Sequence, residues 1–259
     1  MKKIFPATFV AVVLLVLHGC GSNSSSPTGP AAGTSAFLGT FASIQGQNGT
    51  LAVAVQAKVA RATMPFSLPL VATLHAQSIS ATGSLSQVGG GTTSLSGTYD
   101  AGSKNLSLSG GGFTMSGTLG GATVTGTLTA PTGAVGAFAT TNSCSGAVEV
   151  YCVQQTTPSG EKVVFNVAVS PGGAISGTFA ATPSGAGTVT GQRTGTNFTS
   201  TYVTTVGPFA GDSGTSTGTM ANGLLNGVDR FGNPFSGSTA ACGNIANIAG
   251  TIGGNPGTC

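Results

Sequence analysis

Residues 113–128 read FTMSGTLGGATVTGTL. Before the glycine pair, Phe113, Met115, Gly117 and Leu119 fall on one face of the chain, and serine or threonine falls on the other. The second half alternates in the same way. A period of two residues is typical of strands with one buried face, and Gly-Gly is a turn composition. The stretch therefore predicts two antiparallel strands joined by a tight turn.

The same alternation recurs along most of the chain. It is found in TSLSGTY (93–99), AISGTF (174–179), LAVAVQAKV (51–59) and PFSLPLVATLHA (65–76), where Pro69 indicates an edge strand or a bulge. Turn compositions separate these runs at spacings of about ten residues. The predicted fold is all-β, an antiparallel meander forming one or two small barrel-like or sandwich units.

An internal alignment bears on the number of units. Residues 82–102 align without a gap on residues 176–196, and three glycines of one segment coincide with three glycines of the other. Because Gly, Ser and Thr are abundant, chance matches are common, and two organisations stay open. A repeat predicts β unit 1 over 36–141 and β unit 2, with disulfides, over 142–259. Without a repeat, the length permits one larger domain.

Glycine recurs in the middle of the predicted strands, as in Ser-Gly-Thr at 96–98, 116–118 and 176–178. An inward-facing glycine predicts either a sharply coiled strand or an aromatic ring lying over the backbone. The candidate rings are Phe113, Phe165, Phe179, Phe198 and Phe235. Few lysines are present to protect strand edges, so we expect the sheet to close into a barrel or its edges to be covered.

The N-terminal residues have the features expected of a targeting signal. Lys2 and Lys3 precede an apolar run over residues 4–17, which is shorter than the about 20 residues of a membrane span and has the proportions of a secretory signal. The run ends in Leu-His-Gly-Cys at 17–20. This ending resembles the lipobox of bacterial lipoproteins, although His18 is bulkier and more polar than is usual there.

The resemblance implies that residues 1–19 are a signal peptide and that the thiol of Cys20 is lipidated. The alternative is an ordinary signal peptide with an incidental cysteine. Residues 20–35 are rich in Ser, Gly and Pro, which predicts a flexible tether. The resemblance implies export and attachment to a membrane by lipid. In lipoproteins of Gram-negative bacteria, an aspartate after the lipidated cysteine commonly signals retention in the inner membrane. Residue 21 is glycine, so the resemblance implies the outer membrane, on its periplasmic or surface face.

Four cysteines follow Cys20. An even number in an exported chain predicts two disulfides. The nested pairing is Cys152–Cys242 with Cys144–Cys259, and the local pairing is Cys144–Cys152 with Cys242–Cys259. The nested pairing is slightly favoured because it would staple the start of a domain to its end.

The composition argues against two classes of function. Charged residues make up only 5% of the chain, against about 25% in ordinary domains. Without the two N-terminal lysines, six Lys and Arg face five acids, which is too few for a basic patch, so a nucleic-acid partner is not expected. A membrane-spanning barrel is disfavoured, because its aromatic girdles would have to come from a chain with no Trp and three Tyr.

Catalytic chemistry is also not indicated. His75 lies on a predicted strand and is expected to be structural. The acids are Asp100, Glu149, Glu161, Asp212 and Asp229. An acid–base pair of Asp212 and Asp229 is disfavoured. Because no nucleophile triad, phosphate loop or metal-ligand spacing is evident, no catalytic, metal or cofactor-binding residue is assigned, and we expect a protein that is not an enzyme.

Two functions therefore remain. The first is a structural or adhesive contact module of the cell envelope, and the second is a carrier that holds a small hydrophobic ligand in a barrel lumen. The partner of a contact module, whether protein or polysaccharide, is left open. Rows of threonine, such as Thr123, Thr125 and Thr127, could also match a crystalline surface such as ice or polysaccharide. The strand glycines are unevenly spaced along the chain, so a regular ladder is not expected.

Overall fold

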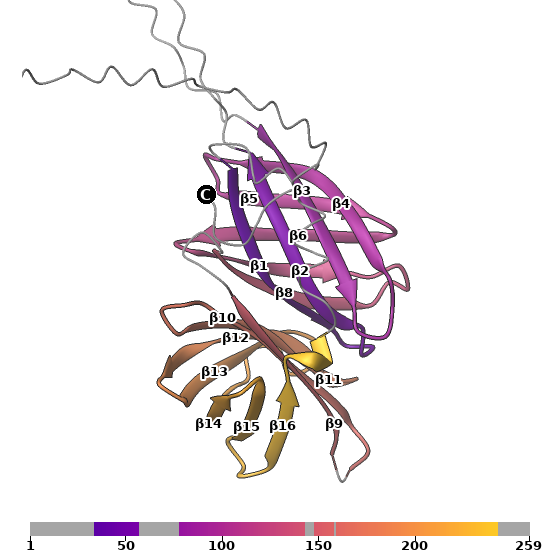
Figure 1. The fold of residues 1–259 in the computed structure, drawn as a ribbon. Coiled ribbons are helices and arrows are strands. Elements are labelled where there is room, and N and C mark those ends of the chain that lie inside the picture. Colours follow the sequence, from indigo (N-terminus) through magenta and orange to yellow (C-terminus); the bar gives the residue numbers. More distant parts are fainter. Residues whose placement is uncertain (1–33, 57–77, 143–147, 158, 243–259) are drawn as a thin grey trace, which may run out of the picture.

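The structure is a computed structural model that describes residues 34–56, 78–142, 148–157 and 159–242. These residues form sixteen β-strands and one short 3-10 helix (Figure 1). The elements are β1 (Thr34–Ser43), β2 (Asn48–Gln56), β3 (Ser78–Gln87), β4 (Thr92–Asp100), β5 (Asn105–Gly110), β6 (Phe113–Gly120), β7 (Thr123–Thr129), β8 (Val135–Asn142), β9 (Glu149–Thr156), β10 (Lys162–Val169), β11 (Ala174–Thr182), β12 (Gly185–Thr194), β13 (Asn197–Val206), β14 (Ser213–Ala221), β15 (Leu224–Val228), β16 (Pro234–Ser238) and η1 (Ala240–Cys242).

The strands form two closed antiparallel barrels (Figure 1). Barrel 1 comprises β1–β8, and β1 pairs with β8 over Phe37–Ser43. Barrel 2 comprises β9–β16, and its closing ladder is short, with only Gly237 opposite Val153 and Ser238 opposite Cys152. The predictions of an all-β meander and of closed edges are confirmed.

The gapless alignment relates equivalent strands of the two barrels. Residues 82–102 contain most of β3 and all of β4, and residues 176–196 contain most of β11 and all of β12. These are the third and fourth strands of barrel 1 and barrel 2 respectively. An origin by duplication stays a prediction. The predicted strand over 65–76 lies outside the described residues, as do residues 57–59 of the strand predicted over 51–59.

The lumen of each barrel is filled by packed side chains. In barrel 1, Phe41 and Phe138 are fully buried, and the rings of Phe41 and Phe113 meet edge to face with centroids 6.3 Å apart. In barrel 2, the ring centroids of Phe165 and Phe235 are 5.2 Å apart. The inward positions of the alternating strands supply these clusters, as the period of two predicts.

Several lumen rings lie directly over strand glycines. A Cβ added to Gly117 would lie 2.5 Å from Cζ of Phe138, and one added to Gly227 would lie 2.5 Å from Cζ of Phe235. Real Cβ atoms do not approach other atoms so closely, so only glycine leaves room for these rings. The predicted use of inward glycines is confirmed at these positions.

The candidate rings divide into two groups. Phe179, Phe198 and Phe235 cover Gly187, Gly218 and Gly227. Phe113 and Phe165 instead pack against other rings. Sequence reasoning did not anticipate that Phe138 covers Gly117.

The two barrels contact each other through the outer faces of β1 and β8 on one side and β10, β11 and β12 on the other (Figure 1). The hydroxyl of Thr40 donates to the backbone carbonyl of Asn166 at 3.1 Å and lies 3.0 Å from the hydroxyl of Thr178. Side-chain amides of Asn166 and Gln154 both donate to Oδ1 of Asn48, at 3.2 and 3.3 Å. Buried apolar side chains surround this polar cluster.

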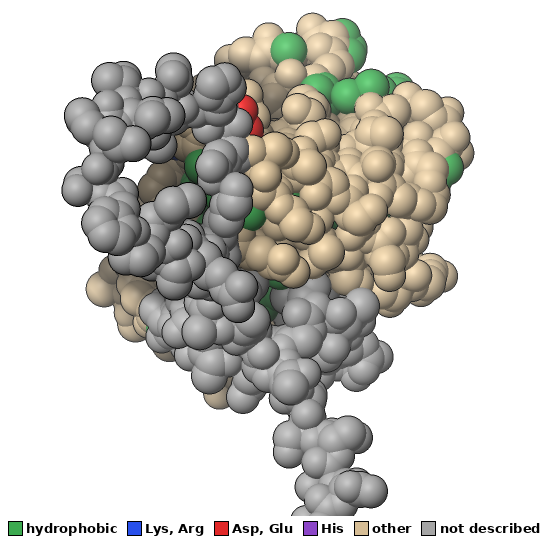
Figure 2. All heavy atoms as spheres, turned by 90° about the horizontal axis from the view of Figure 1, so that it is seen from above, with side chains coloured by type: hydrophobic (Ala, Val, Ile, Leu, Met, Phe, Trp, Pro, Cys, Tyr) green, Lys and Arg blue, Asp and Glu red, His purple; other side chains and the backbone are tan. Residues whose placement is uncertain are grey.

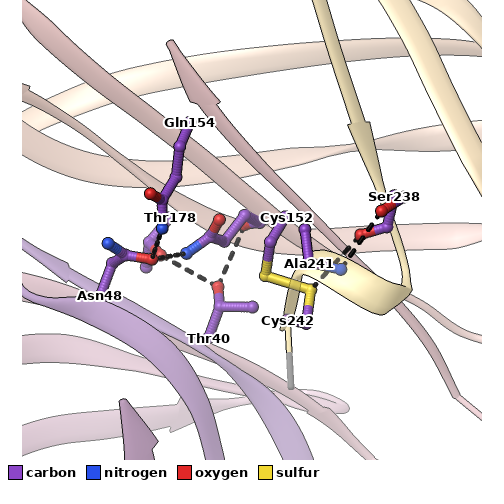
Figure 3. Close-up of a disulfide and its surroundings, with 9 residues drawn as sticks. Thr40, Asn48, Cys152, Gln154, Thr178, Ser238, Ala241 and Cys242 are labelled. Carbon is purple, nitrogen blue, oxygen red and sulfur yellow. Dashed lines mark hydrogen bonds between the residues drawn. A yellow bond between two sulfur atoms is a disulfide. The ribbon is translucent and has the colours of Figure 1, made fainter. Parts of the chain in front are cut away.

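A disulfide joins Cys152 of β9 to Cys242 of η1, next to the contact between the barrels (Figure 3). Because Cys152 pairs with Ser238 of β16, the bond reinforces the short ladder that closes barrel 2. The bond belongs to the nested pairing. Cys144 and Cys259 lie outside the described residues.

Candidate functional site

The outer face of barrel 1 carries two unbroken rows of hydroxyl side chains across five strands, β3 to β7. We call these rows the hydroxyl face. The first row is Ser80, Thr98, Ser107, Ser116 and Thr127, and the second is Thr82, Ser96, Ser109, Thr114 and Thr129. Neighbouring members of a row are separated by the strand spacing of about 4.8 Å, and the two rows by about 6.7 Å. Nine of the ten side chains are exposed, and Thr129 is half-buried.

The hydroxyl face has no charged member. In the described part of barrel 1, the charged residues are Asp100, the last residue of β4, and Lys104, in the turn that follows. From above, the described surface is mostly tan, with some green hydrophobic side chains and a small red area of Asp or Glu, and it shows none of the blue of Lys or Arg (Figure 2). The face therefore offers many hydrogen-bond donors and acceptors without an electrostatic preference.

These rows correct the expectation that no regular ladder of hydroxyls forms. The uneven spacing of glycines along the chain does not set the order of side chains across a sheet. Cross-strand register sets it, and the antiparallel pairing brings Ser107 opposite Ser116, and Ser116 opposite Thr127. Hairpins of different length therefore deliver hydroxyls to the same row.

A second feature is a polar network at one end of barrel 2. Nη1 and Nη2 of Arg193 donate to the carboxylate of Glu149 at 2.7 and 3.2 Å. The hydroxyl of Tyr151 donates to the same carboxylate at 2.6 Å. The Arg193 and Tyr151 hydrogen bonds hold the pKa of Glu149 below its usual value, and burial together with Glu149 raises the pKa of Tyr151 to about 12. Near neutral pH, Glu149 is therefore ionised and Tyr151 keeps its proton.

The network forms the wall of an open pocket of about 460 Å³. The other lining residues come from the turns and strand ends at this end of the barrel: Gly195, Met220, Ala221, Asn222, Gly223 and Thr239. Asn222 and Gly223 both have positive φ, as a two-residue hairpin turn of the Asn-Gly type requires. The pocket combines a buried apolar floor at Met220 with a polar wall.

Sequence reasoning found Glu149 only as one of five acids and missed Tyr151 and Arg193. Glu149 and Arg193 are 44 residues apart in the chain, and no motif links them. One local signal was available. Arg193 shares a face of β12 with Val189 and Gly191, so the period of two places a charged residue on the lumen side of a strand.

The opposite end of barrel 2 carries a second ion pair. Nη1 and Nη2 of Arg230 donate to the carboxylate of Asp212 at 2.9 and 2.7 Å. The guanidinium lies over the rings of Phe231 and Tyr202, at 4.6 and 5.7 Å from the ring centroids. Phe231 is 72% exposed, so this end presents an aromatic side chain to solvent.

The other acids also have hydrogen-bond partners. Asp100 accepts from the backbone N–H groups of Gly102 and Ser103, which lower its pKa. Asp229 accepts from backbone N–H groups in its own turn, and Glu161 accepts from the hydroxyl of Ser184. Asp212 forms its ion pair with Arg230. Among the interactions of the described residues, no hydrogen bond joins Asp212 to Asp229.

Other predicted positions lie outside the described residues. They are Cys20 and the signal peptide, His75, Cys144 and Cys259. Within the described ranges, no group of three His, Cys, Asp or Glu side chains is placed to hold a metal ion. The part of the chain that the structure covers contains no helix with the length and hydrophobicity to cross a bilayer. Comparison with known proteins found neither a family model nor a curated protein that matches this chain.

Proposed function

We propose that this protein is a lipid-anchored, non-enzymatic contact module of the bacterial cell envelope that adheres to uncharged, hydroxyl-rich surfaces, of which polysaccharides are the main class. The observation that carries the proposal is the hydroxyl face, with ten Ser and Thr side chains in two rows and no charge among them. A surface that served only for solubility would not need this order.

Hydroxyl groups suit a neutral polysaccharide because each donates one hydrogen bond and accepts two. Sugar hydroxyls have the same capacity, so donors and acceptors can match without any charge being removed from water. Each contact is weak, since it replaces contacts with water. A row of five hydroxyls can make several such contacts at once, and many anchored copies can bind the same polysaccharide. The first contact raises the effective concentration for the others, so the overall binding is stronger than any single contact.

The anchor is part of the proposal. Lipidation of Cys20 would attach two acyl chains, which gives stable membrane association where a single chain is marginal. Residues 20–35 would then hold the barrels away from the bilayer as a tether. The residue after Cys20 is Gly21 and not aspartate. Since aspartate is the residue that commonly retains such lipoproteins in the inner membrane, the outer membrane is favoured.

The packing of the lumens favours a contact module over a carrier. Phe41, Phe138 and Leu51 are fully buried in barrel 1, and Tyr151 and Leu225 are buried in barrel 2. A carrier needs a lumen with room for its ligand. In this protein, these side chains pack against one another in the lumen, where a carrier would hold its ligand.

The test measures retention of vesicles that carry the full lipidated chain on beads of cross-linked dextran under flow. The face variant is Ser107→Lys with Thr114→Lys, two exposed positions that are not opposite each other. The control is Ser103→Lys with Ala210→Lys, which adds the same charge at exposed turn positions. We expect the face variant to lose retention by about tenfold or more, because several weak contacts fail together.

Salt gives a second readout. Because the proposed contact is uncharged, retention of the unmodified chain should change little between about 0.05 and 0.5 M salt. Equal retention of the face variant and the control would contradict the proposal, and so would loss of retention with salt. A Cys20→Ala chain that stays with the vesicles would contradict the anchor alone.

A further inference from the structure

The pocket at the end of barrel 2 has no role in the proposed contact, since all of its lining residues lie outside barrel 1. The network that forms its wall joins the first strand of this barrel, which carries Glu149 and Tyr151, to the end of β12, which carries Arg193. The turn that holds Asn222 and Gly223 forms another part of the lining. Its volume of about 460 Å³ falls within the usual range for small-molecule sites, about 300–1,000 Å³.

The wall offers acceptors and donors side by side. A carboxylate has about four acceptor positions, and the hydrogen bonds from Arg193 and Tyr151 use three of those on Glu149. A guanidinium has five N–H donors, and two of them point to Glu149. The Glu149 side chain is 47% exposed and the Arg193 side chain 18%, so both can be reached from the pocket.

The charge of the wall selects the class of ligand. Glu149 and Arg193 neutralise each other in a bidentate pair. An anion that accepts from the free N–H groups of Arg193 would lie beside the carboxylate of Glu149, and a cation bound by Glu149 would lie beside the guanidinium. Each charged ligand would therefore be repelled by one member of the pair. A neutral ligand with neighbouring hydroxyls avoids this repulsion, because one hydroxyl can donate to the carboxylate while the next accepts from the guanidinium.

We propose that this pocket binds a neutral sugar residue, with two adjacent sugar hydroxyls bridging Glu149 and Arg193. Met220 supplies an apolar floor, and Asn222 and Thr239 supply further polar groups at the rim. Tyr151 orients the carboxylate of Glu149 by its 2.6 Å hydrogen bond. The site does not depend on the hydroxyl face, because all of its lining residues lie outside barrel 1.

The test is saturation-transfer difference NMR on the full lipidated chain in nanodiscs. The neutral probes are glucose, galactose, mannose and N-acetylglucosamine, and the charged analogues are glucuronate and glucosamine. The pocket variant is Glu149→Gln, which keeps the size of the side chain and removes its charge. The matched control is Asp212→Asn, which alters the other bidentate Arg–carboxylate pair at the opposite end of the same barrel.

We expect at least one neutral sugar to give a signal that Glu149→Gln weakens by about tenfold, the usual effect of losing a charge-assisted hydrogen bond. Asp212→Asn should leave that signal unchanged, and thermal unfolding verifies that both variants are folded. Three outcomes would overturn the inference. They are no signal from any neutral probe, equal or stronger binding of a charged analogue, and equal weakening by the two substitutions.

Discussion

Gly227→Ala is the most informative single change in barrel 2. Gly227 lies in β15 opposite Phe235 of β16. An added Cβ would lie 2.5 and 2.9 Å from Cζ and Cε2 of Phe235, and 3.0 Å from the backbone oxygen of Thr217. The ring cannot move freely, because its centroid is only 5.2 Å from that of Phe165. One methyl group therefore forces several lumen side chains to shift.

Overpacking of this kind costs about 1–3 kcal/mol. For a protein of this size, a loss of about 2 kcal/mol in the free energy of unfolding lowers Tm by about 4–8 °C. The assay is thermal and urea unfolding followed by circular dichroism. Gly120→Ala is the matched control, since its Cβ would have no atom within 4 Å. That substitution should be neutral or slightly stabilising, because alanine restricts the unfolded chain.

A double variant identifies the cause. Phe235→Leu removes the ring atoms that the new Cβ would strike, so Gly227→Ala should cost much less in that background. The expected coupling energy is about 1 kcal/mol or more, as is usual for residues in contact. Strictly additive effects would refute the reasoning that the ring is what requires glycine. The reasoning would also fail if Gly227→Ala were as stable as Gly120→Ala.

Three further predictions concern stability. Replacing Cys152 and Cys242 together by Ser should lower the free energy of unfolding by about 2–5 kcal/mol, since the disulfide spans 90 residues. Urea unfolding in the absence of reductant should show this loss, and an unchanged midpoint would contradict it. Asn48→Ala should lower the free energy of unfolding by about 1–3 kcal/mol, because the fully buried amide of Asn166 loses its acceptor in the contact between the barrels. Urea unfolding measures this loss as well, and an unchanged free energy of unfolding would contradict the prediction. The pKa of Tyr151 is raised to about 12, so its contribution to stability should be complete below the unfolded value of about 10 and disappear as the pH rises toward 12. Burial also raises the pKa of Tyr202, so Tyr151→Phe should reduce the amplitude of the late step in phenolate absorbance without removing all of it. An unchanged amplitude would contradict the assignment.

The sequence predicts the architecture well because its signal is local. In barrel 1, a period of two residues assigns Phe113 and Met115 to the lumen and Ser116 to the outside, and the structure confirms these faces. Mid-strand glycines predict either a sharply coiled strand or a ring over the backbone, and the structure places rings over Gly117, Gly187 and Gly227. Scarce charge predicts closed edges, since open edges would lack protection.

The candidate sites depend on contacts between residues far apart in the chain, which no local sequence pattern reveals. The hydroxyl rows need the register of five strands, and a slip of one residue in any of them would turn the hydroxyls of that strand inward. The ion pair of Glu149 and Arg193 needs closure of barrel 2, which brings β9 and β12 to one rim. The contact of Thr40 with Asn166 needs the packing of one barrel on another. Each of these arises only after local strands have assembled.

The central claim is that this protein acts through its outer surface and not by carrying a ligand in its lumen. Native mass spectrometry of the full lipidated chain, extracted gently from membranes, tests that claim most directly. The account predicts the mass of the lipidated protein alone, with no component that leaves only when the protein is denatured. An apolar compound of fixed mass, retained in the folded state and released on denaturation, would contradict it.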